Sequence, residues 1–119
     1  MMNDMFKTGP TDVERWTEGL HAGITKWKGV KQKRMGLGDA FYLNGEIFAE
    51  MNYTMREVKV RVKLGKTQQQ RAIQLGTAQP EMEQNQHKEG WVYVNVDHDT
   101  RLQDAINLAR QAYMEKQRL

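Results

Sequence analysis

Apolar residues recur along the chain at two spacings, and each spacing predicts a different kind of element. Between residues 11 and 29 the steps are three and four residues long, which places the apolar side chains on one face of a helix. The members of this stripe are Val13, Trp16, Leu20, Ile24 and Trp27. Thr11 followed by Glu14 is a capping-box pattern, which satisfies free backbone donors at a helix start, and Gly29 is the expected stop.

The C-terminal segment shows the same helical spacing, and Asp99 or Thr100 is its expected cap. Its apolar stripe consists of Leu102, Ala105, Ile106, Ala109 and Tyr113. Gly19 and Gly23 lie inside the first predicted helix, where a glycine costs about 1 kcal/mol relative to alanine. We expect this cost to be offset by the close approach of another element at these two positions.

The middle of the chain carries the strand patterns. Residues 57–64 alternate between charged and apolar side chains without interruption, which predicts a strand with one buried and one solvated face. Residues 91–96 form a valine-rich run that predicts a further strand, and the basic stretch 30–35 is expected to be extended. A glycine-rich turn at 36–39 follows that stretch.

Asn44-Gly45 lies between two short apolar runs and is the clearest local signal in the chain. Both residues tolerate the positive φ of a type I′ turn, so the pair predicts a two-residue hairpin loop. The loop length sets the register, which is predicted to place Tyr42 opposite Ile47 and Phe41 opposite Phe48. Farther along, Thr67 is the expected cap of a short helix that ends before Gly76, and the polar residues 77–90 predict a loop.

These elements predict one α+β domain over residues 11–119, preceded by a flexible leader at residues 1–10. The expected architecture is an antiparallel-rich sheet of four to five strands with three helices packed mainly on one face. A chain of 119 residues has room for a single hydrophobic core.

Two residue types are missing from the chain, and their absence narrows the chemistry. Without cysteine there is no disulfide and no thiolate metal site, which suits the cytoplasm, where we expect the protein. Without serine as well, the commonest covalent nucleophiles are lacking. Neither a signal peptide nor a membrane span is predicted, because no apolar run approaches the required length.

Basic residues form two groups that predict a possible contact with nucleic acid. The formal net charge is +3, and the sequence pI is about 9.2. The first group contains Lys26, Lys28, Lys31, Lys33 and Arg34, and the second contains Lys59, Arg61, Lys63, Lys66 and Arg71. If both groups lay on one side they would track phosphates, with Trp27, Tyr42 or Tyr53 as a stacking platform. The alternative is that they are solvated strand faces and helix ends.

Three other features of the sequence give weaker indications of a functional site. Asp97-His98-Asp99 resembles a metal-ligating run, but adjacent residues converge poorly on one ion, so a helix cap and turn is the favoured interpretation. Gly36-Leu37-Gly38 precedes a strand rather than a helix and matches no phosphate-binding motif. The carboxylates Glu46, Glu50 and Glu57 are expected on solvated strand faces. We therefore predict no catalytic residues, no metal site and no cofactor.

A longer stretch resembles a group of small bacterial proteins. Gly36-Leu37-Gly38-Asp39-Ala40-Phe41-Tyr42-Leu43-Asn44-Gly45-Glu46 resembles the glycine-led first hairpin of the YdhG-like proteins, the MmcQ/YjbR family and the TfoX N-terminal domain. The tail is also similar: Pro80, then His87-Lys88-Glu89-Gly90-Trp91, a valine-rich strand, and a helix that ends Arg110-Gln111-Ala112-Tyr113. Asp39 replaces a frequent proline, and His87 is displaced from the place next to tryptophan. The resemblance implies a compact α+β domain, sometimes proposed to bind DNA, and carries over no catalytic residue.

The sequence therefore favours a non-enzymatic module that binds a macromolecule. A protein partner, with this chain acting as an adaptor or inhibitor, ranks first because no catalytic set is present and Met55 and Met82 are expected to be exposed. DNA or RNA binding through the two basic groups is the alternative, and a small-molecule site on the open sheet face ranks third. The sequence leaves the identity of the partner and the oligomeric state open.

Overall fold

Ten helices and strands follow one another over residues 10–118, the part of the chain that the computed structural model describes. They are α1 (Pro10–Thr25), β1 (Val30–Met35), β2 (Gly38–Leu43), β3 (Glu46–Tyr53), β4 (Val58–Lys63), α2 (Lys66–Gln74), β5 (Gln79–Pro80), α3 (Gln84–Lys88), β6 (Trp91–Val96) and α4 (Asp99–Gln117). The first nine residues of the predicted leader lie outside the described residues, and its last residue, Pro10, begins α1.

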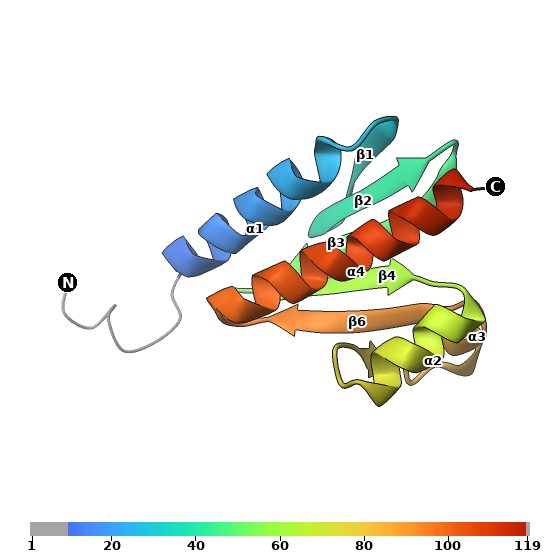
Figure 1. Cartoon of the computed structure of the whole chain (residues 1–119). Coiled ribbons are helices and arrows are strands. Elements are labelled where there is room, and N and C mark those ends of the chain that lie inside the picture. Colours follow the sequence, from blue (N-terminus) through green and yellow to red (C-terminus); the bar gives the residue numbers. More distant parts are fainter. Residues whose placement is uncertain (1–9, 119) are drawn as a thin grey trace.

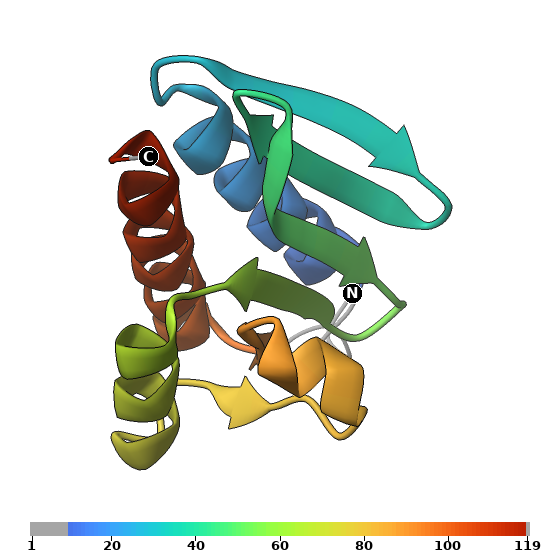
Figure 2. The ribbon, with the colours of Figure 1, turned by 90° about the vertical axis from the view of Figure 1, so that its right-hand side faces the viewer.

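All six strands form one antiparallel sheet in the order β1-β2-β3-β4-β6-β5. The long helices α1 and α4 lie side by side against one face of this sheet, and β1 and β5 are its two edges (Figures 1 and 2). The α+β class and the antiparallel sheet are confirmed. The predicted counts were too low, since residues 10–118 form six strands and four helices. The elements that were not predicted are β5 and α3, which lie in the predicted loop 77–90, whereas the stretch 30–35, expected to be extended, is strand β1.

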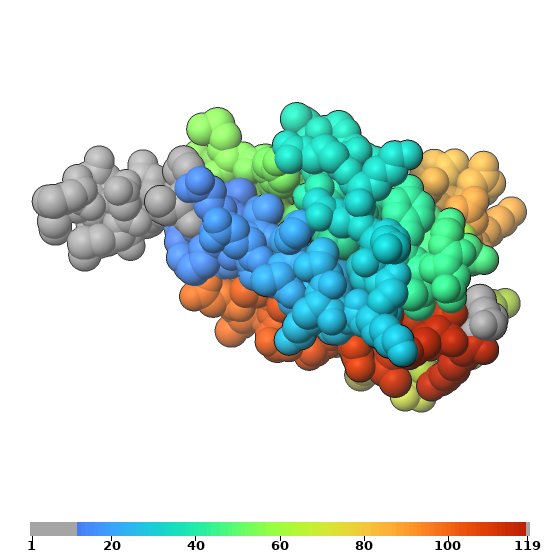
Figure 3. Space-filling model, turned by 90° about the horizontal axis from the view of Figure 1, so that it is seen from above, coloured from blue at the N-terminus to red at the C-terminus, as the bar shows by residue number. Residues whose placement is uncertain are grey.

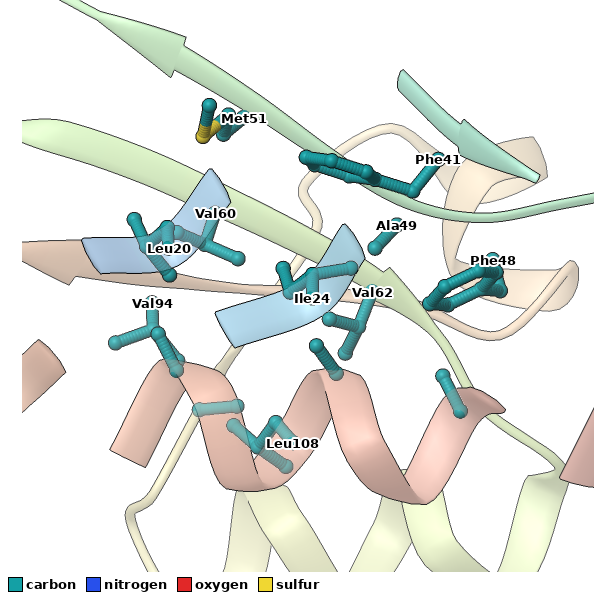
Figure 4. Packing of buried hydrophobic residues seen from close by; sticks show 14 of the residues in the cluster. Leu20, Ile24, Phe41, Phe48, Ala49, Met51, Val60, Val62, Val94 and Leu108 are labelled. Atoms are coloured by element: carbon teal, nitrogen blue, oxygen red, sulfur yellow. The ribbon is translucent and has the colours of Figure 1, made fainter. Parts of the chain in front are cut away.

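The core lies between the sheet and the two long helices (Figure 4). The alternation in β4 is confirmed, because Val58, Val60 and Val62 are buried toward the helices while the charged residues between them are half-buried on the other side. Leu20 and Ile24 of α1 pack into the same cluster and are fully buried. We call the opposite side of the sheet the outer face.

Contact between α1 and α4 explains the two glycines inside α1. A Cβ atom on Gly19 would lie 3.3 Å from Leu102 Cδ2, and one on Gly23 would lie 3.4 Å from Ile106 Cδ1. Leu102 and Ile106 both belong to the predicted apolar stripe of α4. The expected close approach at these two positions is confirmed, and it offsets the low helix propensity of glycine.

The β2–β3 hairpin confirms the predicted turn but corrects part of the register. Asn44 and Gly45 have φ values of 54° and 81°, as a type I′ turn requires, and Tyr42 pairs with Ile47. Phe41, however, pairs with Ala49 rather than with Phe48, because a bulge lies between Phe41 and Tyr42 in the ladder. Phe48 is the extra residue of this bulge, since it has no partner in β2. The bulge allows Phe48 and Ala49, which are adjacent in sequence, both to be buried in the core, which strict alternation would forbid.

Three predicted helix boundaries were wrong. α1 ends at Thr25 rather than at Gly29, whose φ of 83° instead belongs to the turn that leads into β1. The residue before α2 is Gly65, so Thr67 lies inside the helix, and Glu115 of α4 accepts the Gly65 amide proton at 2.7 Å. The stop at Gly76 is confirmed by its φ of 75°. The Thr11 side chain lies outside the described residues, so its capping box stays a prediction.

The third boundary is the start of α4. His98 is the residue before this helix and makes no side-chain cap, whereas Asp99 is the first helical residue and bonds to α1 instead. Residues 77–90 are not a loop, since β5 pairs with β6 and Glu83 caps α3 by accepting from the Gln86 amide. Within residues 10–118, no helix has the length and apolar character needed to cross a bilayer.

Candidate functional site

Arg61 is the centre of a charged network on the outer face. Its Nη1 lies 2.6 Å from Glu50 Oε1 and its Nε lies 2.7 Å from Glu81 Oε2, while its Nη2 donates to Gln86 of α3. The guanidinium carbon lies 4.5 Å from the centroid of the Trp91 ring. With its side chain only 17% exposed, Arg61 is committed to the protein itself.

The neighbouring lysines of β4 are only partly engaged in interactions within the protein. Lys59 Nζ lies 3.9 Å from Glu81 Oε2 and 4.3 Å from the centroid of the Tyr93 ring. Lys63 is half-buried opposite Trp91 at the end of the strand. Because Glu50 and Glu81 lie among these cations, the outer face of β4 presents less positive charge than its sequence suggests.

The two predicted basic groups do not form one continuous stripe. Lys66 and Arg71 are exposed on α2, which lies at the β5 side of the sheet, whereas β1 is the opposite edge (Figure 1). Nor is Trp27 free to stack on a base, since its ring lies 5.3 Å from that of Tyr113 and 5.2 Å from the Arg110 guanidinium carbon. The described structure therefore separates the cations that the sequence grouped together.

Edge strand β1 holds the remaining predicted cations, and we call Lys31, Lys33 and Arg34 the basic edge. All three are exposed, and none forms an ion pair with residues 12–118. In Figure 3, which looks onto this side of the molecule, the blue-to-cyan atoms that run from the end of α1 into β1 occupy the middle of the surface. The basic edge is thus uncovered in the part of the chain that the structure describes.

Gln32 fixes the basic edge to the rest of the domain. Its Nε2 donates to Asp39 Oδ1 at 2.8 Å, and its Oε1 lies 2.5 Å from His21 Nε2 of α1. Arg34 donates to the Tyr53 hydroxyl at 3.2 Å. Val30 packs against the core, so alternation directs Lys31 and Lys33 to the outer face and Gln32 and Arg34 to the helix side.

The predicted Asp97-His98-Asp99 run does not converge on a common point. Asp99 Oδ1 accepts from Trp16 Nε1 at 2.8 Å and from Arg15 Nη2 at 2.6 Å, both on α1. His98 contacts Asp97 at 3.5 Å and also the Thr100 hydroxyl. Among residues 10–118, no three histidine, aspartate or glutamate side chains are grouped as metal ligands would be.

We expect Asp99 to make stability depend on acid pH. The hydrogen bond from Trp16, and then that from Arg15, lowers the pKa of Asp99 below its ordinary value of 3.8. A lowered folded pKa stabilises the protein above the unfolded pKa, and the contribution is lost as pH falls through the folded pKa. Wild-type unfolding free energy should therefore fall below about pH 4 more steeply than that of Asp99→Asn.

Urea unfolding at a series of pH values, followed by circular dichroism, measures this difference. Asp97→Asn is the matched control, because Asp97 makes no hydrogen bond or ion pair with α1 among the described residues. Parallel pH curves for wild type and Asp99→Asn would contradict the prediction.

A hollow of about 400 Å³ lies between α2 and α3, and its most buried polar residue is Gln69. The Gln69 amide donates to the His87 carbonyl at 2.8 Å and lies 3.4 Å from His87 Nδ1. Gln69 therefore links α2 to α3, and its side-chain NH₂ group is already hydrogen-bonded within the protein. The carboxylates Glu46 and Glu50 are likewise paired, with Lys116 at 2.7 Å and with Arg61.

Comparisons with protein families, curated proteins and solved structures found no match. The resemblance to the YdhG-like, MmcQ/YjbR and TfoX N-terminal group stays a prediction. Glu81 and Gln86 were not predicted as partners of Arg61, because the sequence of residues 77–90 predicts a loop. The available signal was Glu83 three residues before Gln86, the spacing of a helix cap.

Proposed function

We propose that this protein is a non-enzymatic binding module whose partner is an acidic protein segment, held at the basic edge. The observation that carries the proposal is the contrast between Arg61, which has two carboxylate partners, and the exposed Lys31 and Lys33, which pair with no carboxylate of residues 12–118. Unpaired cations on a fixed strand are free to meet charge from outside. Lys26 and Lys28, which are exposed in the turn before β1, add to the positive electrostatic potential near the basic edge.

A protein segment fits this edge better than a nucleic acid does. An edge strand presents both N–H donors and C=O acceptors, and another peptide complements both, whereas phosphate oxygens only accept. Strand β1 also spans just six residues, about 20 Å. Of the three aromatic candidates for base stacking, Trp27 is covered by Arg110, the Tyr53 hydroxyl accepts a hydrogen bond from Arg34, and the Tyr42 hydroxyl contacts Met35. Nucleic-acid binding through Lys31, Lys33 and Arg34 is the second candidate, supported by the same unpaired charge.

Fluorescence polarisation with four labelled probes tests the proposal: polyglutamate, duplex DNA, single-stranded DNA and RNA, each at low and physiological salt. We expect polyglutamate to bind and the double variant Lys31→Glu/Lys33→Glu to lose that binding. Lys66→Glu/Arg71→Glu carries the same charge change on α2 and should bind as wild type does. Tighter binding of a nucleic acid that survives physiological salt would overturn the protein proposal in favour of the second candidate.

A further inference from the structure

The two edges of the sheet differ in how much backbone they offer to a partner. β5 has two residues, one of them Pro80, which lacks a backbone N–H. β1 has six residues, pairs only with β2 among the described elements, and is exposed from Lys31 to Met35. Any strand that extends this sheet by several hydrogen bonds must therefore add at β1.

We propose that the acidic partner binds as an extended segment that adds a seventh strand to the sheet, antiparallel to β1. This inference rests on the proposed function and specifies its mode. Every pair in the existing sheet is antiparallel, and a strand is the one occupant that satisfies the free backbone groups of β1 and its cations together.

Side-chain alternation along β1 defines the sequence of the segment. Lys31, Lys33 and Met35 share the outer face at steps of two residues, and Met35 is 43% exposed. Leu37, in the turn beyond, is 75% exposed, and the Tyr42 hydroxyl lies 3.8 Å from Met35 Sδ. An antiparallel segment that complements this face reads apolar, any residue, acidic, any residue, acidic, because opposite charges and apolar pairs stabilise facing positions.

A second copy of this chain is a poor occupant of the same edge. Antiparallel pairing of β1 with itself must place outer-face residues opposite outer-face residues. Centred on Gln32 it places each Lys31 opposite Lys33 of the other copy, and centred on Lys33 it places the two Lys33 side chains opposite each other. Like charges at directly opposed positions destabilise a strand pair. The cations that attract an acidic segment thus also oppose self-association.

Backbone methylation of a short peptide distinguishes strand addition from charge attraction. The parent probe is threonine-leucine-threonine-glutamate-threonine-glutamate-threonine, and two derivatives carry N-methyl groups on complementary alternate amides. The alternation of the side chains fixes which backbone edge of the peptide faces β1. One derivative therefore lacks the N–H groups that would donate to β1, whereas the other lacks only N–H groups that point away from it. We expect at least about tenfold weaker binding for the first derivative and affinity within about twofold of the parent for the second.

Amide hydrogen exchange with the parent peptide present should slow in β1 and not in α2. Equal binding of both methylated peptides, with binding still abolished by Lys31→Glu/Lys33→Glu, would overturn strand addition and leave the basic-edge function standing. The same conclusion follows if polyglutamate binds and the parent peptide does not. If Lys31→Glu/Lys33→Glu changes no probe, the proposed function itself fails. A concentration-dependent dimer that buries β1, measured by light scattering and hydrogen exchange, would also overturn the inference.

Discussion

Gly38→Ala is expected to destabilise the protein by about 3 kcal/mol or more, a large fraction of the stability of a typical domain. An added Cβ would lie 1.8 Å from the Met51 carbonyl oxygen and 2.8 Å from Asn52 Oδ1. Strand pairing holds this backbone on both sides, since Gly38 pairs with Met35 of β1 and with Asn52 of β3. The clash can be relieved only by separating strands.

Gly36→Ala is the matched control in the same turn. Gly36 has a φ of 54° but no atom within 4 Å of an added Cβ, so alanine there should cost only about 1 kcal/mol of backbone strain. Urea unfolding followed by far-ultraviolet circular dichroism compares the two variants. Equal losses at both positions would show that the β2–β3 contact yields easily, and β1 would then be less firmly positioned than the proposed partner site requires.

Arg61→Ala is expected to cost about 3–5 kcal/mol, because it leaves two partly buried carboxylates without their cation. The side chains of Glu50 and Glu81 are 20% and 12% exposed and both bond to the guanidinium. Truncation also removes the group stacked on Trp91, which is 5% exposed. Lys63→Ala, on the same strand and face, is the control and should cost less than about 1 kcal/mol.

A compensating variant separates the charge from the packing. Adding Glu50→Gln and Glu81→Gln to Arg61→Ala should recover part of the lost free energy, since no uncompensated charge is then left on the outer face. Full additivity of the three changes, or a loss no larger than that of Lys63→Ala, would contradict the role assigned to the network. Charge reversal at Arg61 is accordingly a poor probe of nucleic-acid binding, because the variant would lose stability and binding together.

Local patterns in the sequence predicted the elements whose structure depends on near neighbours. The apolar stripe of α1 from Val13 to Ile24, the alternation of β4 and the Asn44-Gly45 turn were confirmed, and so was the glycine stop at Gly76, whereas Trp27 lies beyond the end of α1. Each depends on the periodicity of a helix or strand, or on which residues tolerate positive φ. Such effects act over a few residues and are therefore visible without any tertiary contact.

The bulge beside Phe41, the pairing of β5 and the capping of α2 were decided by the tertiary structure. Glu115 of α4 reaches the start of α2, fifty positions away in the sequence. The bulge is stabilised because it allows an additional apolar side chain, that of Phe48, to be buried in the core. Asp99 is similar, because its partners lie on α1 rather than in its own helix. No local pattern specifies partners at such separations.

The candidate site divides in the same way. Sequence alone determined that β4 carries cations at alternate positions and that residues 30–35 are basic, since that depends only on residue type and strand periodicity. That residues 30–35 form an edge strand was decided by the tertiary structure. Which cations remain available was decided by the fold, which brings Glu50 and Glu81 to Arg61 across 11 and 20 positions and places none beside Lys31 or Lys33 among the described residues. Charge pairing depends on distance in space, and the order of strands in the sheet sets that distance.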